Sequence, residues 1–148
     1  MKILIDGDGC PVTDLVINLA APYNIPVILI CDTAHVCNRE GIKTIMVNKG
    51  RDATDFELMR HVQKGDIIVT QDYGLAAMGL TKQAYVIHQS GMQYTTQNID
   101  QLLFARHLSQ KIRNSGGRLK GPAKRTRDDD LAFKTSFQSL LSRLTTTN

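Results

Sequence analysis

Short apolar segments alternate along this chain with segments of helical periodicity, and this alternation limits the possible folds more than any other feature. Strands that are apolar on both faces and alternate with helices are typical of parallel sheets covered on both sides. The sequence therefore predicts an α/β fold, with a three-layer, mostly parallel five-stranded sheet and helices on both faces. The predicted strands lie at residues 2–5, 27–31, 43–47, 66–70 and 84–87.

The length of 148 residues suits a single domain with one core, spanning residues 1–148. Helices are predicted between the strands, and one of them begins with a capping box formed by Thr54 and Glu57. A basic segment, residues 111–127, carries glycines and Pro122 and is predicted to be a loop. A C-terminal helix over residues 130–144 follows this loop as an appendage.

Charge is distributed unevenly along the chain. Residues 1–104 carry 8 Lys/Arg and 11 Asp/Glu, whereas residues 105–148 carry 10 Lys/Arg and 3 Asp. A basic segment beside an acidic one indicates a polyanionic partner such as RNA, although an ordinary solvated basic surface would look the same. The candidate nucleic-acid-binding residues are Lys49, Arg51, Lys120, Lys124, Arg125 and Arg127.

The remaining composition favours a cytoplasmic protein. No apolar run approaches the length of a membrane span, and the N-terminal segment lacks the pattern of a signal peptide. The three cysteines, at positions 10, 31 and 37, show no zinc-binding spacing, so we expect reduced thiols. Cys10 precedes a predicted helix, where a reactive thiolate is possible, but a structural role is the simpler expectation.

Aspartates gather where strands are predicted to end. Asp6 and Asp8 follow the first apolar run, and Asp72 follows the fourth. In open parallel sheets, ligands bind beyond the carboxyl ends of the strands, at the point where the strand order reverses. If the first and fourth strands are neighbours, Asp6 and Asp72 lie side by side there. Asp55 opens the helix that leads back into the fourth strand.

Converging carboxylates repel one another and stay ionised at neutral pH only when cations neutralise them. Mg²⁺ and Mn²⁺ prefer such oxygen ligands, and one or two of these ions could clamp a phosphodiester. Each aspartate also has a purely structural interpretation. Asp8 or Asp72 could cap the helix that follows it, and Asp55 complements a helix dipole.

Several segments resemble, in order, the YaiI/YqxD family of bacterial proteins. The family signature D-A-D-A-C-P-V is similar to I-D-G-D-G-C-P-V at residues 5–12, and its K-G-x-D-x-x-D segment is similar to N-K-G-R-D-A-T-D at 48–55. Its G-D-I-V-V-T-x-D-x-x-L-A motif resembles D-I-I-V-T-Q-D-Y-G-L-A-A at 66–77. Residues 87–99 and 121–126 also resemble family segments. Gly7 and Gly9 stand where the family usually has alanines.

This resemblance implies a PIN-like fold with an acidic site at the carboxyl edge of the sheet. PIN domains are typically Mg²⁺- or Mn²⁺-dependent ribonucleases. Matched by motif, Asp6, Asp55 and Asp72 would be the catalytic metal ligands. Asp8 and Asp52 would be further ligands or would support the ligands from outside, and Thr70 would orient the turn that carries Asp72.

We therefore expect a metal-dependent nuclease that cuts RNA, with the basic C-terminal segment contacting the RNA backbone. The few aromatic residues argue against extensive base stacking. A non-catalytic PIN-like domain that binds RNA or a protein remains an alternative. A phosphatase of the haloacid-dehalogenase type, with Asp6 as nucleophile, is a second alternative, although Pro11 leads straight into a helix and leaves no room for the flap of that family.

Overall fold

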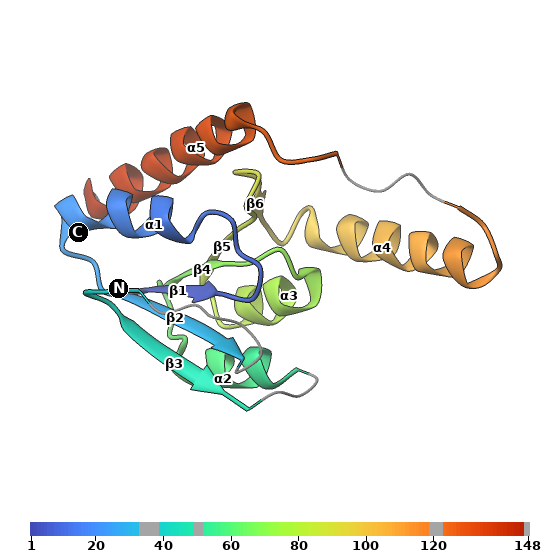
Figure 1. Cartoon of the computed structure of the whole chain (residues 1–148), viewed down its shortest axis with the longest axis horizontal. Coiled ribbons are helices and arrows are strands. Elements are labelled where there is room, and N and C mark those ends of the chain that lie inside the picture. Colours follow the sequence, from blue (N-terminus) through green and yellow to red (C-terminus); the bar gives the residue numbers. More distant parts are fainter. Residues whose placement is uncertain (33–38, 49–51, 119–122, 147–148) are drawn as a thin grey trace.

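The sheet is mostly parallel and is built on the first strand. The computed structural model describes residues 1–32, 39–48, 52–118 and 123–146. Within these ranges, six strands form one sheet in the order β3-β2-β1-β4-β5-β6, and the first five are parallel (Figure 1). The strands are β1 (Ile3–Asp6), β2 (Val27–Asp32), β3 (Lys43–Val47), β4 (Ile67–Val69), β5 (Tyr85–Ile87) and β6 (Gln93–Tyr94).

The predicted α/β class is confirmed, but the predicted count of five strands is wrong. The additional strand, β6, has two residues and pairs antiparallel with β5. A tight turn precedes it, in which the Gly91 N–H donates to the His88 carbonyl at 2.9 Å and Gly91 takes a positive φ of 94°. So short a strand carries no hydrophobic period, and the sequence pattern therefore does not reveal it.

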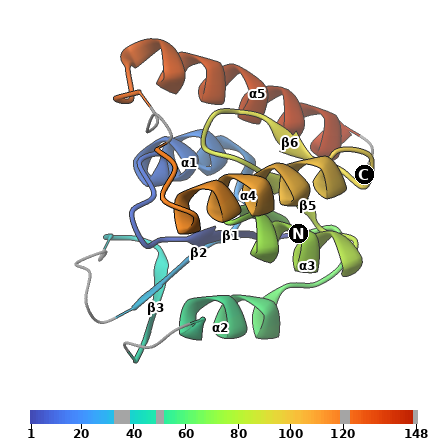
Figure 2. The same ribbon diagram turned by 90° about the vertical axis from the view of Figure 1, so that its right-hand side faces the viewer.

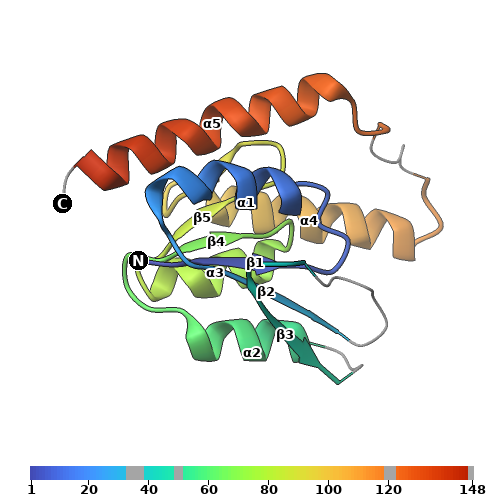
Figure 3. The ribbon, with the colours of Figure 1, turned by 60° about the vertical axis from the view of Figure 1, so that its left-hand side comes forward.

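Helices cover both faces of the sheet because successive strand residues point to opposite sides. Ile3 and Ile5 belong to one apolar cluster, with side chains of α1 and α5, whereas Leu4 belongs to a second cluster with α2, α3 and the start of α4. Helices α1 and α5 lie on one side of the sheet, and α2 and α3 lie on the other (Figures 2 and 3). No helix in the described part of the chain is long and apolar enough to cross a membrane. The helices are α1 (Thr13–Ala20), α2 (Ala53–His61), α3 (Tyr73–Thr81), α4 (Ile99–Asn114) and α5 (Arg127–Thr146), with a short 3₁₀ turn, η1, at Ala21–Tyr23.

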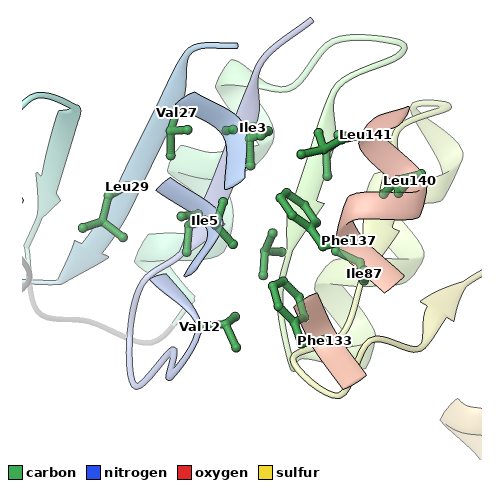
Figure 4. Packing of buried hydrophobic residues seen from close by; sticks show 14 of the residues in the cluster. Ile3, Ile5, Val12, Val27, Leu29, Ile87, Phe133, Phe137, Leu140 and Leu141 are labelled. Carbon is green, nitrogen blue, oxygen red and sulfur yellow. The ribbon is translucent and has the colours of Figure 1, made fainter. Parts of the chain in front are cut away.

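Helix α5 is part of the core. Its apolar stripe is buried against the face of the sheet that α1 also covers, and Phe133 and Phe137 stack with ring centroids 5.3 Å apart (Figure 4). The helix is longer than the expected span of 130–144 because Asp129 accepts hydrogen bonds from Thr126 at its first turn. The buried residues of the stripe are Phe133, Phe137, Leu140, Leu141 and Leu144.

The predicted basic loop at residues 111–127 is shorter in the structure. Helix α4 continues through Asn114, where its helical pattern of hydrogen bonds is closed by Gly116 at a positive φ of 87°. Arg127 already belongs to α5, so residues 115–126 connect the two helices. Lys111 and Arg113 therefore lie on a helix rather than in a loop.

The expected reduced state of the cysteines is wrong for Cys31. Cys31 is disulfide-bonded, whereas Cys10 is a free thiol. Burial raises the pKa of the Cys10 thiol above its ordinary value, which disfavours the thiolate. The structure thus supports a packing role for Cys10 rather than a nucleophilic one.

A buried ion pair closes the amino edge of the sheet, opposite the end where the strands carry Asp6 and Asp72. Asp66 is 3% exposed, and its carboxylate accepts from Lys2 Nζ at 2.6 Å, from the Lys2 N–H at 3.1 Å and from the Gln63 N–H at 2.8 Å. These bonds fix β1 to the turn that leads into β4.

Replacing Asp66 by alanine should destabilise the fold, because it leaves a lysine and two backbone donors without their acceptor. We expect the free energy of unfolding to fall by about 3 kcal/mol in urea denaturation. The matched control is Asp14→Ala, which removes an exposed ion pair with Arg39 and should cost less than about 1 kcal/mol. Equal losses in the two variants would contradict this role of Asp66.

Candidate functional site

The strand order reverses between β1 and β4, where the expected neighbours meet. β1 pairs in parallel with β4, and Ile5 lies opposite Val69. Asp6, the last residue of β1, therefore faces Thr70, the first residue after β4. β2, which follows β1 in the chain, lies on one side of β1, and β4 lies on its other side. The strands that follow β1 and β4 in the chain are therefore added in opposite directions across the sheet. This is the position at which open parallel sheets bind ligands.

Thr70 links the two strand ends. Its side chain is buried, and its hydroxyl donates to Asp6 Oδ2 at 2.8 Å while accepting from the Asp72 N–H at 3.0 Å. The hydroxyl of Tyr94, on β6, donates to the Thr70 carbonyl at 3.3 Å. Thr70 thus orients both Asp6 and the turn that carries Asp72.

Asp72 caps α3, as the structural interpretation of this residue predicts. Its Oδ1 accepts from the Gly74 and Leu75 N–H groups at 2.8 and 3.2 Å. No described residue donates a hydrogen bond to Oδ2. The cap uses only one carboxylate oxygen, so capping and ligand binding are compatible in this residue.

Asp8 does not cap the helix that follows it. The N-cap position of α1 is Val12, which makes no side-chain cap, because a turn separates the aspartate from the helix. Asp8 Oδ1 instead accepts from the Asp32 N–H at 3.0 Å, and Oδ2 accepts from Thr54 Oγ1 at 2.8 Å. Asp8 therefore ties the turn after β1 to the end of β2 and to the start of α2.

The predicted capping box at the start of α2 is also wrong. The Thr54 hydroxyl is committed to Asp8, and Glu57 contacts His61 and Arg60 further along the helix. The N-cap position is Asp52, which has a positive φ of 64° and makes no side-chain cap. In a capping box the threonine hydroxyl would accept from the Glu57 N–H. Here Thr54 lies inside the helix, and its hydroxyl donates to Asp8 instead.

Gly7 holds the aspartate-bearing turn close to β2. Its N–H donates to the Ile30 carbonyl at 2.7 Å. A Cβ at this position would lie 2.6 Å from Leu29 Cδ1 and 3.0 Å from the Ile30 oxygen. The alanine that family segments usually have here would therefore require Leu29 to move.

Six aspartates line one open cleft, which we call the acidic cleft, with a volume of about 690 Å³. The predicted residues Asp6, Asp55 and Asp72 all lie on its wall. Among the described residues that line the cleft, one side chain is basic. It is Arg106 of α4, whose guanidinium lies 3.6 Å from Asp72 Oδ1. The other polar lining residues are Asp8, Asp32, Asp52, Thr54, Gln71, Tyr73 and Ser109.

Burial and mutual repulsion raise the pKa of two of these carboxyls. Burial is the largest cause for Asp6, whose pKa rises to about 6 despite the hydrogen bond from Thr70, with the charges of Asp8 and Asp72 adding to the rise. The pKa of Asp55 also rises to about 6, first through burial and then through the charges of Asp72 and Asp6. Perturbation of this kind is typical of functional sites.

The donor chemistry of the acidic cleft fits a hard divalent cation, since its lining carboxylates supply oxygen ligands and an unneutralised charge. The geometry is not that of a ready-made site. Among the described residues, no three His, Cys, Asp or Glu side chains are grouped so that they could hold a metal ion. A cation would have to draw the side chains together from β1, α2 and α3.

Two charged lining residues are absent from the sequence analysis. Asp32 ends β2 just as Asp6 ends β1, so the rule that selected Asp6 would also have selected Asp32. Arg106 lies on α4, far along the chain from the aspartate motifs, and no spacing in the sequence points to it.

The predicted basic residues are only partly placed. Lys49, Arg51 and Lys120 lie outside the described residues. Lys124 and Arg127 are exposed. Arg125 is engaged in the fold, because its guanidinium donates to Asp130 Oδ1 at 2.7 Å and to the Gln89 carbonyl at 3.0 Å. It therefore joins the start of α5 to the turn before β6.

Comparison with known proteins gives a family over nearly the whole chain. Residues 4–143 match the family model described as Uncharacterized BCR, YaiI/YqxD family. The chain belongs to the YaiI/YqxD family. A UPF0178 protein of Exiguobacterium sibiricum is 52% identical over 145 residues, covering 98% of this chain and 99% of that protein. No solved structure matches.

Other relatives are similar over comparable lengths. A UPF0178 protein of Ruminiclostridium cellulolyticum is 52% identical over 137 residues, covering 93% of this chain and 90% of its own. One of Clostridium acetobutylicum is 46% identical over 145 residues, covering 97% and 98%. The resemblance to the YaiI/YqxD family on which the site residues were selected is thereby confirmed.

Removing the charge of Asp6 should stabilise the folded chain at neutral pH. A carboxyl that ionises near pH 6 when folded and near 3.8 when unfolded binds more protons in the folded state between these values. The free energy of unfolding should therefore fall as the pH rises from about 4 to about 6. With allowance for solvent screening, we expect Asp6→Asn to be more stable than wild type at pH 7 by roughly 1–2 kcal/mol.

Urea denaturation in a metal chelator at pH 5 and pH 7 tests this expectation. The matched control is Asp100→Asn, which changes an exposed aspartate at the start of α4. The control should follow the wild-type pH dependence. A parallel pH dependence for Asp6→Asn would show that Asp6 titrates alike in the folded and unfolded states.

Proposed function

We propose that this chain is a metal-dependent nuclease with a PIN-like fold, which hydrolyses RNA phosphodiesters in the acidic cleft. The observation that carries the proposal is the convergence of Asp6, Asp55 and Asp72 on one cleft at the reversal of strand order. Two of these carboxyls have pKa values raised to about 6, so an unneutralised set is unfavourable near neutral pH. A divalent cation would relieve that repulsion.

The PIN-like assignment draws on two features. The parallel strands in the order β3-β2-β1-β4-β5 bring the first and fourth strand ends together, which supports an acidic site at the carboxyl edge such as the family resemblance implies. Five of the six aspartates at that edge lie in segments that match the family motifs, and Asp32 is the exception. Membership of the YaiI/YqxD family supports carrying the PIN-like comparison over to these positions.

The residues have distinct tasks in this proposal. Mg²⁺ or Mn²⁺, as one ion or two, would be held by Asp6, Asp55 and Asp72, and would activate water and stabilise the leaving oxygen. Thr70 holds the Asp6 carboxylate through Oδ2. Both oxygens of Asp8 accept hydrogen bonds from Asp32 and Thr54, so Asp8 positions the surrounding turns, with any metal contact added to those bonds. Asp52 is exposed at the rim, where it adds negative charge.

A non-catalytic PIN-like domain that binds RNA or a protein is the second candidate. The observation in its favour is that the described carboxylates are not grouped as a metal site. The phosphatase alternative would instead require a phosphoryl group on Asp6, and trapping of a phosphoenzyme would identify it.

An RNA cleavage assay with and without Mn²⁺ separates these candidates. We expect wild-type activity to require the metal, and we expect Asp6→Asn and Asp72→Asn to lower the rate by about 100-fold or more. Asparagine also serves as an N-cap, so Asp72→Asn should preserve α3. Asp100→Asn is the control and should retain activity.

Thermal unfolding gives a readout that does not depend on turnover. Mn²⁺ should raise the melting temperature of wild type and have a much smaller effect on Asp6→Asn, because ligand binding to the folded state stabilises it. Activity that survives in either aspartate variant would contradict the nuclease assignment. RNA binding without cleavage or a Mn²⁺ effect would favour the non-catalytic domain.

A further inference from the structure

A second pocket, with an apolar wall, opens directly beside the acidic cleft. It lies between α2 and α3 and has a volume of about 710 Å³. Its apolar side chains are Phe56 and Met59 of α2 and Met78 of α3. It shares four lining residues with the acidic cleft, namely Asp52, Asp55, Asp72 and Arg106. The acidic cleft and the apolar pocket therefore adjoin along these four residues.

Two of the three apolar side chains of this wall are exposed to solvent, whereas Met59 is half-buried and packs against the core. The side chain of Phe56 is 73% exposed and that of Met78 is 41% exposed. Single exposed apolar residues are ordinary, but a gathering of them next to a charged cleft is typical of a binding surface. Phe56 follows Asp55 directly in α2, so the first turns of this helix serve both hollows.

We propose that this apolar pocket binds one unpaired nucleobase of a single-stranded RNA whose neighbouring phosphate lies in the acidic cleft. The proposal rests on the proposed function and names its substrate class. A nucleic-acid strand alternates neutral, planar bases with anionic phosphates. The structure offers the matching alternation, with an aromatic and two thioether side chains in one hollow and a charged site in the next.

The charges at the shared wall favour this occupant. Asp52, Asp55 and Asp72 border the apolar pocket and would repel an anion there, whereas a nucleobase carries no charge and offers polar edges to carboxylates. Arg106 lies at the boundary of the two hollows. Among the described lining residues, it is the one cation that can contact a phosphate of the RNA. A base that is paired in a duplex cannot enter the pocket, so single strands are required.

Stacking on one aromatic side chain agrees with the low aromatic content of the chain. The sequence argues against extensive base stacking, and the structure places a single exposed phenylalanine where one base is needed. Stacking of a base on an aromatic ring tolerates any sequence, because every base has a π-face. The pocket therefore selects an unpaired nucleotide rather than a particular base.

Binding of a fluorescein-labelled eight-nucleotide oligouridylate, followed by anisotropy with Ca²⁺ in place of Mn²⁺, tests the proposal. Gel analysis verifies that the RNA stays intact. We expect Phe56→Ala to weaken binding about tenfold and Phe56→Tyr, which keeps the ring, to bind within about threefold of wild type. Phe104→Ala is the matched control, because Phe104 is 63% exposed on α4 and lines neither hollow, and it should bind as wild type does. Thermal unfolding checks that each variant is folded.

An abasic scan locates the base. Removing the base at one position of the oligonucleotide should weaken binding to wild type and have little further effect on Phe56→Ala, since the same contact is already lost. RNA duplex should bind without dependence on Phe56. Unchanged single-strand binding by Phe56→Ala, an equal loss with duplex, an equal loss in Phe104→Ala, or no RNA binding by wild type at low salt would each overturn the proposal.

The two proposals fail separately. Phe56-dependent binding of single strands without Mn²⁺-dependent cleavage would leave the nucleobase pocket in place and remove the nuclease assignment. Cleavage that depends on Asp6 with binding independent of Phe56 would retain the nuclease and remove the pocket.

Discussion

The parallel pairing of β1 with β4 is the constraint on which the rest of the structure depends. It places the strand that begins the chain at the centre of the sheet and reverses the strand order beside it. The relative positions of Asp6 and Asp72 in the acidic cleft follow from this pairing. The Thr70 hydroxyl reaches Asp6 only because the two strand ends are in register, and α3 starts where Asp72 can both cap the helix and face the cleft.

The site combines rigid supports with an electrostatic cost. Thr70, Thr54 and the backbone N–H groups of α3 fix the carboxylates, whereas their burial and mutual repulsion raise two of the pKa values. An arrangement that served stability alone would not gather six aspartates around one cleft. Sites whose electrostatic repulsion destabilises the folded state are expected where a protein binds a ligand that removes that repulsion.

The sequence predicts the sheet class and the carboxylates because both depend on local patterns. Apolar runs mark the strands, and aspartates at their ends mark the edge of the sheet. The predicted capping box at Thr54 is wrong because the helix already begins at Ala53, and the Thr54 hydroxyl donates to Asp8, 46 residues away in the sequence. β6 is too short to show the alternation of apolar and polar residues that marks a strand. Arg106 and the apolar pocket at Phe56 arise from the packing of α2, α3 and α4, which no local pattern specifies.

The position of α5 has a consequence for the order in which the chain can fold during synthesis. This helix supplies Phe133 and Phe137 to the apolar cluster that covers β1, yet it is made only after all six strands have been translated. The sheet can pair before that point, but one face remains partly uncovered. A nascent chain that pauses before α5 therefore exposes an apolar surface to other proteins, and chaperones are the expected protection for that interval.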